Sequence, residues 1–201
     1  MTRGAYRRFL VPGLSTLVML AVLIGLGTWQ VYRLHWKERI LAQIAAAETK
    51  PPVPLTPAHA LPPYSKVAAT GRFRFDRAVA FGAEVRDTNG GPTLGTYQIV
   101  PLERDGDRPV LVNRGWIPQK RTAPLDEPAG TVAVAGYLRP GDRAGWFSAA
   151  DDPAARQFFT LDPAAIGAAV NIPGLEPFVL VAIGAPGPYP IPAEHLPRPP
   201  N

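Results

Sequence analysis

The longest uninterrupted apolar pattern lies near the start of the chain. Residues 9–32, FLVPGLSTLVMLAVLIGLGTWQVY, contain no charged side chain and follow a basic N-terminus at residues 1–8. A helix of about 20 apolar residues crosses the hydrocarbon core of a bilayer. The apolar part of a secretory signal is shorter, about 7–15 residues, and ends at a cleavage site that residues 25–28 match poorly. The pattern therefore predicts a retained transmembrane helix at residues 9–32.

Helical spacing of apolar residues continues beyond this run. They recur among charged and polar residues at Leu34, Ile40, Leu41 and Ile44. This period predicts a helical stem at residues 33–50. Pro51 and Pro52 end the stem, because proline lacks the amide donor and clashes with the preceding turn. A proline-rich linker follows at residues 51–63.

The apolar period changes to two after the linker. Three stretches alternate clearly: AVAFGAEVR at 78–86, RPVLVNRGW at 108–116 and TVAVAGYLR at 131–139. Alternation with β-branched residues is typical of half-buried strands. Weaker patterns predict further strands at 65–75, 96–102, 157–161 and 177–183. In the second stretch the alternation predicts one shared face for Val110, Val112, Arg114 and Trp116.

Turn residues separate the predicted strands. Asn89-Gly90-Gly91 and Asp105-Gly106-Asp107 supply the positive-φ positions that tight hairpins need. Residues 162–170 have a helical pattern, with an acidic cap followed by proline at the first helical position. The predicted fold is an N-terminal transmembrane α-helix followed by a mainly β domain at residues 64–185, an antiparallel sheet or open barrel with one short helix. A proline-rich tail follows at residues 186–201.

Composition narrows the chemistry that these elements can support. The 201 residues carry a net charge of +5 and include no cysteine and two methionines. Without cysteine there is no disulfide, thiolate metal site, covalent c-type haem or cysteine nucleophile. The chain also lacks the soft ligands of a Cu(I) carrier. Few aromatic residues accompany the basic ones, so we expect no nucleic-acid partner.

No pattern in the sequence predicts catalysis. Nucleophile-elbow, zinc-protease, phosphate-loop and dinucleotide motifs are absent. The acidic pairs Asp105/Asp107 and Asp151/Asp152 lie in polar turns, where carboxylates cap backbone amides. The three histidines lie off every predicted strand, at His35, His59 and His195. We therefore expect no catalytic or metal site; a hydrolase or carbohydrate-binding domain would need a carboxylate or histidine cluster.

The end of the apolar run, residues 27–37, combines aromatic, cationic and amide side chains in GTWQVYRLHWK. Trp29, Arg33 and Trp36 share one helical face, and Gln30 places a polar amide at the edge of the apolar core. One interpretation is an interfacial belt in membrane lipid, with aromatic rings and snorkelling cations. The other adds contact with a partner in the membrane, because small residues earlier in the run would let another helix approach closely.

Arg114 is a charged residue on the predicted inward face of its strand, between Val112 and Trp116. A buried guanidinium needs an anionic partner. Arg114 therefore forms either a structural ion pair, which we favour, or a ligand contact, and Trp116 beside it is a partner or structural contact. Asn113 and Gly115 are assigned to strand geometry.

Three stretches form a recognisable set. LGTWQVYRLHWK at 26–37 has the pattern L-G-x-W-Q-x-x-R-x-x-W-K, and VLVNRGWIP at 110–118 has the pattern V-L-V-N-R-G-W-[VI]-P. GYLRP at 136–140 has the pattern G-x-x-R, with a following aromatic at Trp146 or Phe147 and FFTLD at 158–162. In order and spacing, over roughly residues 20–200, the set resembles the surfeit locus protein 1 family, the cytochrome c oxidase assembly factors.

The resemblance implies a role, a place and a cofactor. The role is that of a non-enzymatic assembly factor that helps to deliver haem a to, or insert it into, subunit I of haem-copper cytochrome c oxidase. Its partners would be subunit I and other oxidase subunits or assembly factors. The place is the inner or cell membrane, with the β domain on the periplasmic or intermembrane-space side, an orientation that the flanking charges leave open. The alternative is a non-haem scaffold that holds oxidase subunits during assembly.

Under this resemblance Trp29 and Trp36 would stack on the haem macrocycle, and Arg33 would pair with a propionate. Family members carry a second membrane helix near the C-terminus, entered through a P-P-N-x-H-L-like stretch whose histidine is the favoured haem ligand. The sequence reaches RPPN at 198–201. We therefore expect either a truncated sequence or a one-helix member. His195 precedes that position and is not assigned the ligand role.

Overall fold

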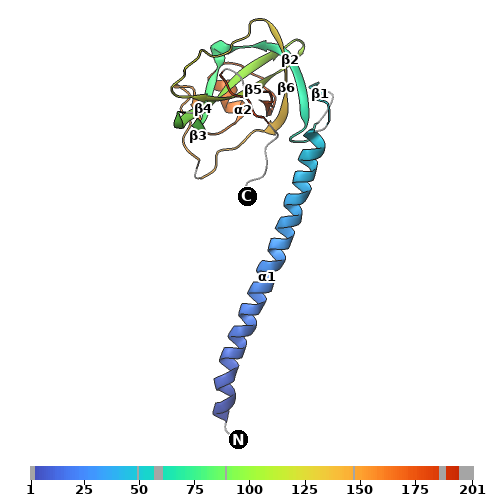
Figure 1. Ribbon diagram of the computed structural model, residues 1–201, viewed down its shortest axis with the longest axis vertical. Coiled ribbons are helices and arrows are strands. Elements are labelled where there is room, and N and C mark those ends of the chain that lie inside the picture. The colour runs from blue at the N-terminus through green and yellow to red at the C-terminus, as the bar shows by residue number, and fades with distance from the viewer. Residues whose placement is uncertain are drawn as a thin grey trace. The chain divides into compact units, whose positions relative to one another are not determined.

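The computed structural model describes residues 3–48, 50–56, 61–88, 90–146, 148–185 and 189–194. The chain divides into two units, a helical one that contains Met1–Ala45 and a β unit, Ala46–Pro197. A single long helix forms the first unit, and a strongly curved sheet forms the second (Figure 1).

Helix α1, Arg3–Glu48, is continuous over 46 residues. The apolar run and the stem are therefore parts of one helix, which ends before Pro51 as the missing amide donor of proline requires. Within the described residues, Pro12–Ala42 is the one helical stretch that is long and apolar enough to cross a membrane. Its 31 residues extend about 46 Å, more than the hydrocarbon thickness of about 30 Å.

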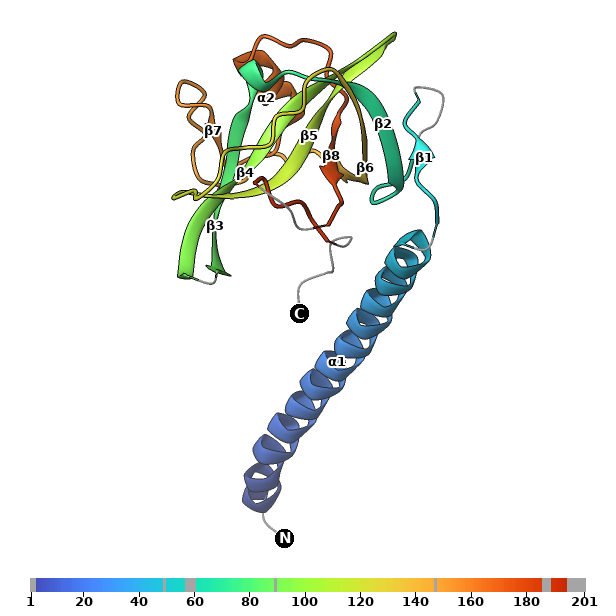
Figure 2. The ribbon, with the colours of Figure 1, turned by 45° about the horizontal axis from the view of Figure 1, so that its top comes forward.

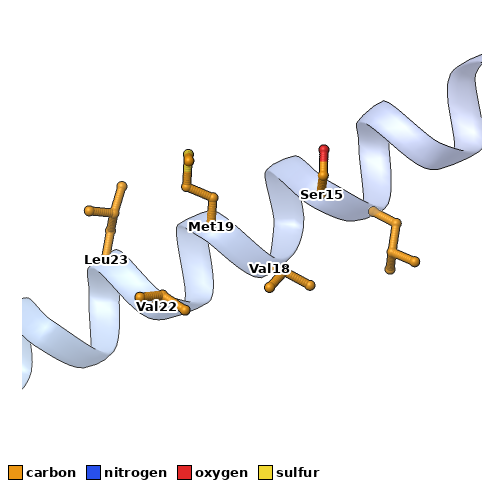
Figure 3. A pocket seen from close by; sticks show the side chains of 6 residues that line it. Ser15, Val18, Met19, Val22 and Leu23 are labelled. Atoms are coloured by element: carbon orange, nitrogen blue, oxygen red, sulfur yellow. The ribbon is translucent and has the colours of Figure 1, made fainter.

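Apolar side chains cover the surface of this stretch. Figure 3 shows Val18, Met19, Val22 and Leu23 projecting from the helix near Ser15. Each of these four side chains is more than half exposed within the protein. The Ser15 hydroxyl donates back to the Pro12 carbonyl oxygen at 2.9 Å, so this polar group is satisfied within the helix. Such a surface is stable in lipid or against another apolar helix.

The β unit is one mixed eight-stranded sheet. Its described helices are α2, Pro163–Ala169, and the one-turn 3-10 helix η1, Phe75–Arg77. In chain order the strands are β1 Val53–Pro54, β2 Lys66–Phe73, β3 Val79–Thr88, β4 Gly91–Arg104, β5 Asp107–Pro118, β6 Thr131–Pro140, β7 Gln157–Phe158 and β8 Phe178–Ala182.

Five of these strands close into a barrel. The sheet order β2-β6-β8-β5-β4 returns to β2, because Arg72 and Phe73 at the end of β2 pair with Glu103 and Leu102 of β4. Gly71 permits this closure, since a Cβ there would lie 2.2 Å from the Glu103 carbonyl oxygen. The curved wall is visible in Figure 2, where β2, β6, β8, β5 and β4 surround a common centre.

The predicted fold class, a mainly β domain with one short helix, is confirmed, but the sheet is not purely antiparallel. Three strand pairs are parallel, namely β1–β2, β3–β7 and β5–β8. The connection through α2 gives the physical reason for the last of them. The chain leaves β7, crosses the outside of the barrel as α2 and returns beside β5 in the same direction, as a parallel crossover requires.

Two apolar clusters, one on each face of the barrel wall, stabilise the β unit. The interior receives side chains from every wall strand, including Val67, Val100, Val112, Leu138 and Leu180. Outside β4 and β5, α2 and its flanking segments cover a second cluster that includes Ile99, Leu111, Phe158, Leu161 and Ile166. Neighbouring residues such as Ile99 and Val100 point into different clusters, as strand alternation demands. Each fully buried side chain of this size contributes about 1.5–3 kcal/mol.

Most predicted elements of the β unit are present, and two short ones, β1 and η1, were missed. The three clearly alternating stretches become β3, β5 and β6. Asp162 caps α2 as predicted, because its Oδ1 accepts hydrogen bonds from the amides of Ala164 and Ala165 at 2.9 and 3.4 Å. Strand β1 lies inside the predicted linker, and Leu55 after it is buried and donates its amide hydrogen to Ala68 at 2.8 Å. Two residues of strand are too few to alternate.

The alternation predicts a single face of β5 for Val110, Val112, Arg114 and Trp116, and this prediction is wrong for Trp116. Asn113 and Gly115 pair with consecutive residues of β4, so Arg114 between them is an extra residue, a β-bulge. The bulge shifts the alternation by one position. Trp116 therefore lies opposite Tyr97, which packs against the outer cluster.

Candidate functional site

The end of the apolar run of α1 is the first candidate site. Trp29, Arg33 and Trp36 follow helical spacing along one face, and the two tryptophans are 53% and 52% exposed. The Arg33 Cζ lies 5.6 Å from the centre of the Trp29 ring, within the range of a cation–π contact. Gln30 beside them is also exposed. This face presents flat apolar rings and a positive charge to whatever lies against it.

The face formed by Trp29, Arg33 and Trp36, called the exit face below, carries two aromatic rings and one cation. Tryptophan rings suit stacking, and a guanidinium suits a carboxylate. His35 lies off the face of Arg33 by helical spacing, and its Nδ1 is 3.3 Å from Glu38 Oε2. Among the described residues, no group of three or more His, Cys, Asp or Glu side chains could hold a metal ion. The exit face therefore offers flat rings and a cation, and His35 lies on another side of the helix.

The bulge of β5 is the second candidate site. Arg114 Nη1 donates to Gln98 Oε1 at 3.2 Å and to the Asp126 carbonyl oxygen at 2.6 Å. Arg114 Nη2 donates to Asp126 Oδ2 at 3.3 Å. The Cζ atom lies 5.0 Å from the centres of both the Phe73 and the Phe75 rings. Asp126 is thus the anionic partner that a buried arginine needs.

Burial dominates the electrostatics of Arg114. Its side chain is 10% exposed, whereas that of Asp126 is 58% exposed. Burial lowers the pKa of the Arg114 guanidinium, although the charges of Asp126 and Glu127 oppose that shift. Arginine remains charged because its ordinary pKa is above 12. The site is therefore a buried cation with a largely hydrated counter-ion.

The bulge also holds a C-terminal strap, residues 189–194. Trp116 and Ile191 exchange two backbone hydrogen bonds of 2.8 and 2.9 Å. On the other side of the strap, Ala193 donates to the Ala182 carbonyl oxygen at 3.2 Å and accepts from the Gly184 amide at 3.1 Å. The strap thus fills the space where β5 and β8 separate.

Asn113 and Gly115 shape the bulge so that the strap can pass. Asn113 Oδ1 accepts the amide hydrogen of Gly115 at 3.0 Å. Gly115 has a φ of 126°, and a Cβ there would lie 2.0 Å from the Ile191 carbonyl oxygen. A residue without a side chain is required by both the conformation and the close approach. The strap contact explains why a glycine follows Arg114.

Trp116 packs in a second group outside the barrel, the Arg86 group, which consists of Glu84, Arg86, Tyr97 and Trp116. Sequence patterns did not identify its other members. Arg86 lies between two rings, with its Cζ 5.5 Å from the centre of Tyr97 and 5.3 Å from that of Trp116. Glu84 accepts hydrogen bonds from the Arg86 guanidinium at 2.9 Å and from the Tyr97 hydroxyl. Burial would raise the pKa of Glu84, but the hydrogen bonds from Tyr97 and Arg86 outweigh it and hold the pKa below its ordinary value. Because Arg86 occupies the space between the rings, Trp116 serves as a structural contact.

The members of the Arg86 group come from β3, β4 and β5, so no local sequence pattern marks them. A register shift in β3 between Phe81 and Glu84 sets which of its residues face Tyr97. Trp116 Nε1 donates to the Glu84 carbonyl oxygen at 3.2 Å across the same strands. Only the pairing of β3, β4 and β5 brings the four side chains together.

The remaining motif residues have varied positions. Gly136 of β6 lets β8 approach, since a Cβ there would lie 2.1 Å from the Val181 carbonyl oxygen. Arg139 donates to Asp142 Oδ2 at 2.7 Å. Trp146 is fully exposed. Some residues named in the sequence analysis lie outside the described residues, namely His59, Asn89, Phe147, His195 and 198–201.

A groove of about 420 Å³ opens beside Arg114. Arg114 and Asp126 are the charged residues that line it. Its apolar walls come from β2, β6, the end of β8 and the strap, and include Phe73, Val132, Val134, Ala182, Pro190 and Pro192. The groove combines a buried cation with apolar side chains, although nearly half of its exposed surface is polar.

Comparison with known protein families and relatives gives consistent matches. The model of the SURF1 family matches residues 17–200. A SURF1-like protein of Monosiga brevicollis is 32% identical over 155 residues, which cover 70% of this chain and 59% of that protein. Surfeit locus protein 1 of Arabidopsis thaliana is 25% identical over 229 residues, covering 87% of this chain and 65% of the relative.

The cytochrome oxidase assembly protein SHY1 of Saccharomyces cerevisiae is a further relative. It is 37% identical over 107 residues, which cover 49% of this chain and 26% of that protein. The chain thus spans less than two thirds of the length of each of these three relatives.

Proposed function

Because this chain belongs to the SURF1 family, we propose that it is an assembly factor for haem-copper cytochrome c oxidase. The family match over residues 17–200 is the observation that carries the proposal. The relative from Saccharomyces cerevisiae, named as a cytochrome oxidase assembly protein, supports it. In this role the chain assists the delivery of haem a to subunit I, or its insertion there. Haem a is cargo, and the chain acts by binding rather than by catalysing a reaction.

The proposed location is the inner or cell membrane. Pro12–Ala42 has the length and composition to span it, and the apolar surface of this stretch suits lipid. Trp29 and Trp36 lie toward the end of the apolar run, where aromatic residues favour the boundary between lipid and water. The β unit then lies on the periplasmic side, or on the intermembrane-space side in a mitochondrion.

In the proposed complex the exit face of α1 contacts the cargo or the nascent subunit. The Trp29 and Trp36 rings stack on the macrocycle, and Arg33 donates charge-assisted hydrogen bonds to a propionate. Gln30 offers an amide to a polar group of a subunit I helix. Other oxidase subunits and assembly factors are further proposed partners.

A second candidate function is a non-haem scaffold that holds oxidase subunits in an assembly-competent state. The observation that favours it is that His35, the histidine beside the exit face in the sequence, lies on another side of α1 and contacts Glu38. The scaffold predicts that the chain copurifies with oxidase subunits and carries no haem.

A paired substitution at the exit face distinguishes the two functions. Trp29→Leu with Arg33→Gln removes the stacking ring and the cation while keeping the helix apolar. The measurement is haem a absorbance per subunit I in membranes from cells that depend on this chain. Haem delivery predicts a severalfold fall in this ratio, with the variant still in the membrane. The matched control, Trp146→Leu with Arg143→Gln, removes the same residue types from the β unit.

The levels of haem a and of subunit I together distinguish the two functions. A fall in subunit I and haem a together, at a constant ratio, supports the scaffold. Unchanged haem a and subunit I would remove the exit face from either mechanism.

A further inference from the structure

The N-R-G-W stretch of β5 builds a groove that the proposed assembly role does not use. Arg114 reaches the groove from the bulge. Gly115 lets the strap approach closely enough for Pro190 and Pro192 to line one side. Strand β6 lines the other side with small and β-branched side chains. One short motif thus supplies the cation of the groove and positions its wall.

The cation of the groove is desolvated but retains donor capacity. The Arg114 side chain is nine-tenths buried and lies over the Phe73 and Phe75 rings. A guanidinium has five N–H donors in a fixed planar fork. The hydrogen bonds to Gln98 and Asp126 use Nη1 and Nη2. A planar acceptor that enters the groove can therefore bond to the same fork.

Asp126 is held by its backbone more firmly than by its carboxylate. Its amide donates to the Tyr189 carbonyl oxygen at 2.7 Å, and its own carbonyl oxygen accepts from Arg114 at 2.6 Å. The carboxylate makes one contact of 3.3 Å, beyond the usual range of 2.7–3.2 Å, and its side chain is 58% exposed. A single long contact from a largely hydrated carboxylate holds that side chain weakly. The Asp126 side chain can therefore turn into water while its backbone stays in place.

We propose that the groove binds a small monocarboxylate with a compact apolar body, whose carboxylate replaces the Asp126 side chain on Arg114. Charge complementarity selects the carboxylate, because Arg114 is the buried cation of the groove. Exchanging one carboxylate for another leaves no charge buried without a partner. The apolar side chains of β6 and the strap select a compact apolar body, and a volume of about 420 Å³ lies within the usual range for small-ligand sites.

The test is a ligand-observed NMR titration of the full chain in detergent with phenylacetate. Phenylacetamide, which has the same shape without the charge, is the matched ligand. We expect phenylacetate to bind and phenylacetamide to bind at least about tenfold more weakly, because hydrogen bonds between charged groups are the strongest. Arg114→Gln should weaken phenylacetate binding by about tenfold or more. Arg143→Gln, at an arginine that lines a different hollow beside α2, should leave it unchanged.

A second pair of variants tests the exchange without altering Arg114. Asp126→Asn should tighten phenylacetate binding severalfold, because the competing carboxylate is gone. Glu127→Gln should tighten it less, since Glu127 acts on Arg114 by charge and not through a hydrogen bond. If Arg114→Gln fails to fold, this pair decides the question.

Several results would overturn the proposal. They are the absence of phenylacetate binding, equal binding of phenylacetamide, wild-type affinity in folded Arg114→Gln, and equal effects of Asp126→Asn and Glu127→Gln. The titration uses neither oxidase nor haem. A negative titration would therefore not bear on the proposed assembly role. Likewise, evidence against the assembly role would not bear on ligand binding in the groove.

Discussion

Gly106, in the turn before β5, and Gly115, within β5, share a left-handed backbone conformation but differ in the atoms packed around them. Gly115 and Gly106 both have positive φ, 126° and 76°. A Cβ at Gly106 would meet no atom within 4 Å, whereas one at Gly115 would meet the strap at Ile191. Alanine therefore strains the backbone at both positions and displaces the strap only at Gly115.

Gly115→Ala is expected to lower the free energy of unfolding by about 2–4 kcal/mol. Gly106→Ala is the control and should lower it by about 1 kcal/mol, the cost of the left-handed conformation alone. Urea unfolding followed by tryptophan fluorescence measures both. Equal losses in the two variants would show that the strap does not press on Gly115.

Ionisation of Tyr137 should make the β unit less stable at alkaline pH. Burial raises the pKa of its hydroxyl from 10.0 to about 12. A group whose pKa is raised on folding contributes stability that is present below its unfolded value and is lost as the pH rises through its folded value. The free energy of unfolding should therefore decline by about 1–3 kcal/mol between pH 10 and 12.

Tyr137→Phe should flatten this decline, because phenylalanine has no hydroxyl to ionise. Tyr64→Phe, at an exposed tyrosine whose ring centre lies 6.4 Å from that of Tyr137, should leave the decline in place. Urea titrations at stepped pH provide the comparison. A decline as steep in Tyr137→Phe as in the unaltered chain would contradict the assignment.

At the scale of elements, the helix α2 depends on a cap that the sequence predicts. Asp162→Ala should lower the free energy of unfolding by about 1 kcal/mol, because the amides of Ala164 and Ala165 lose their acceptor. Asp162→Asn keeps an acceptor oxygen and should stay close to the unaltered chain. Thermal unfolding by circular dichroism measures the difference. Equal destabilisation by alanine and asparagine would mean that charge, and not capping, matters at this position.

Local patterns identify most elements because their signals lie within the elements themselves. Alternation marks β3, β5 and β6, and an uncharged run marks the apolar part of α1. The parallel pairing of β5 with β8 joins segments far apart in the chain, so no local pattern contains it. The bulge at Arg114 is a single inserted residue, and a strict period of two therefore assigns Trp116 to the wrong face.

In the candidate sites, the sequence predicts features set by local spacing but not the contacts made by chain folding. Helical spacing places Trp29, Arg33 and Trp36 on one face, and a buried arginine on a strand predicts an anionic partner. The identity of that partner was not predictable, because Asp126 lies in an irregular segment that only the closed barrel brings to Arg114. The strap contact with Gly115 depends on chain folding in the same way.

At the scale of the whole molecule, the absence of cysteine allows the proposed orientation to be tested. Lys120→Cys introduces a thiol at an exposed position of the β unit, and Thr2→Cys introduces one before α1. In intact spheroplasts a membrane-impermeant maleimide should label the first variant, because the proposed side is periplasmic. The second should react only after permeabilisation. The reverse labelling pattern would contradict the orientation.

The most direct test of the assembly role is the haem a absorbance of membranes from a strain that lacks this chain. The comparison is the same strain with the chain restored, measured as reduced-minus-oxidised spectra at equal total membrane protein. The proposed role predicts a strong loss of the haem a band without the chain and its recovery on restoration. A haem a band of normal intensity in the absence of the chain would contradict that role.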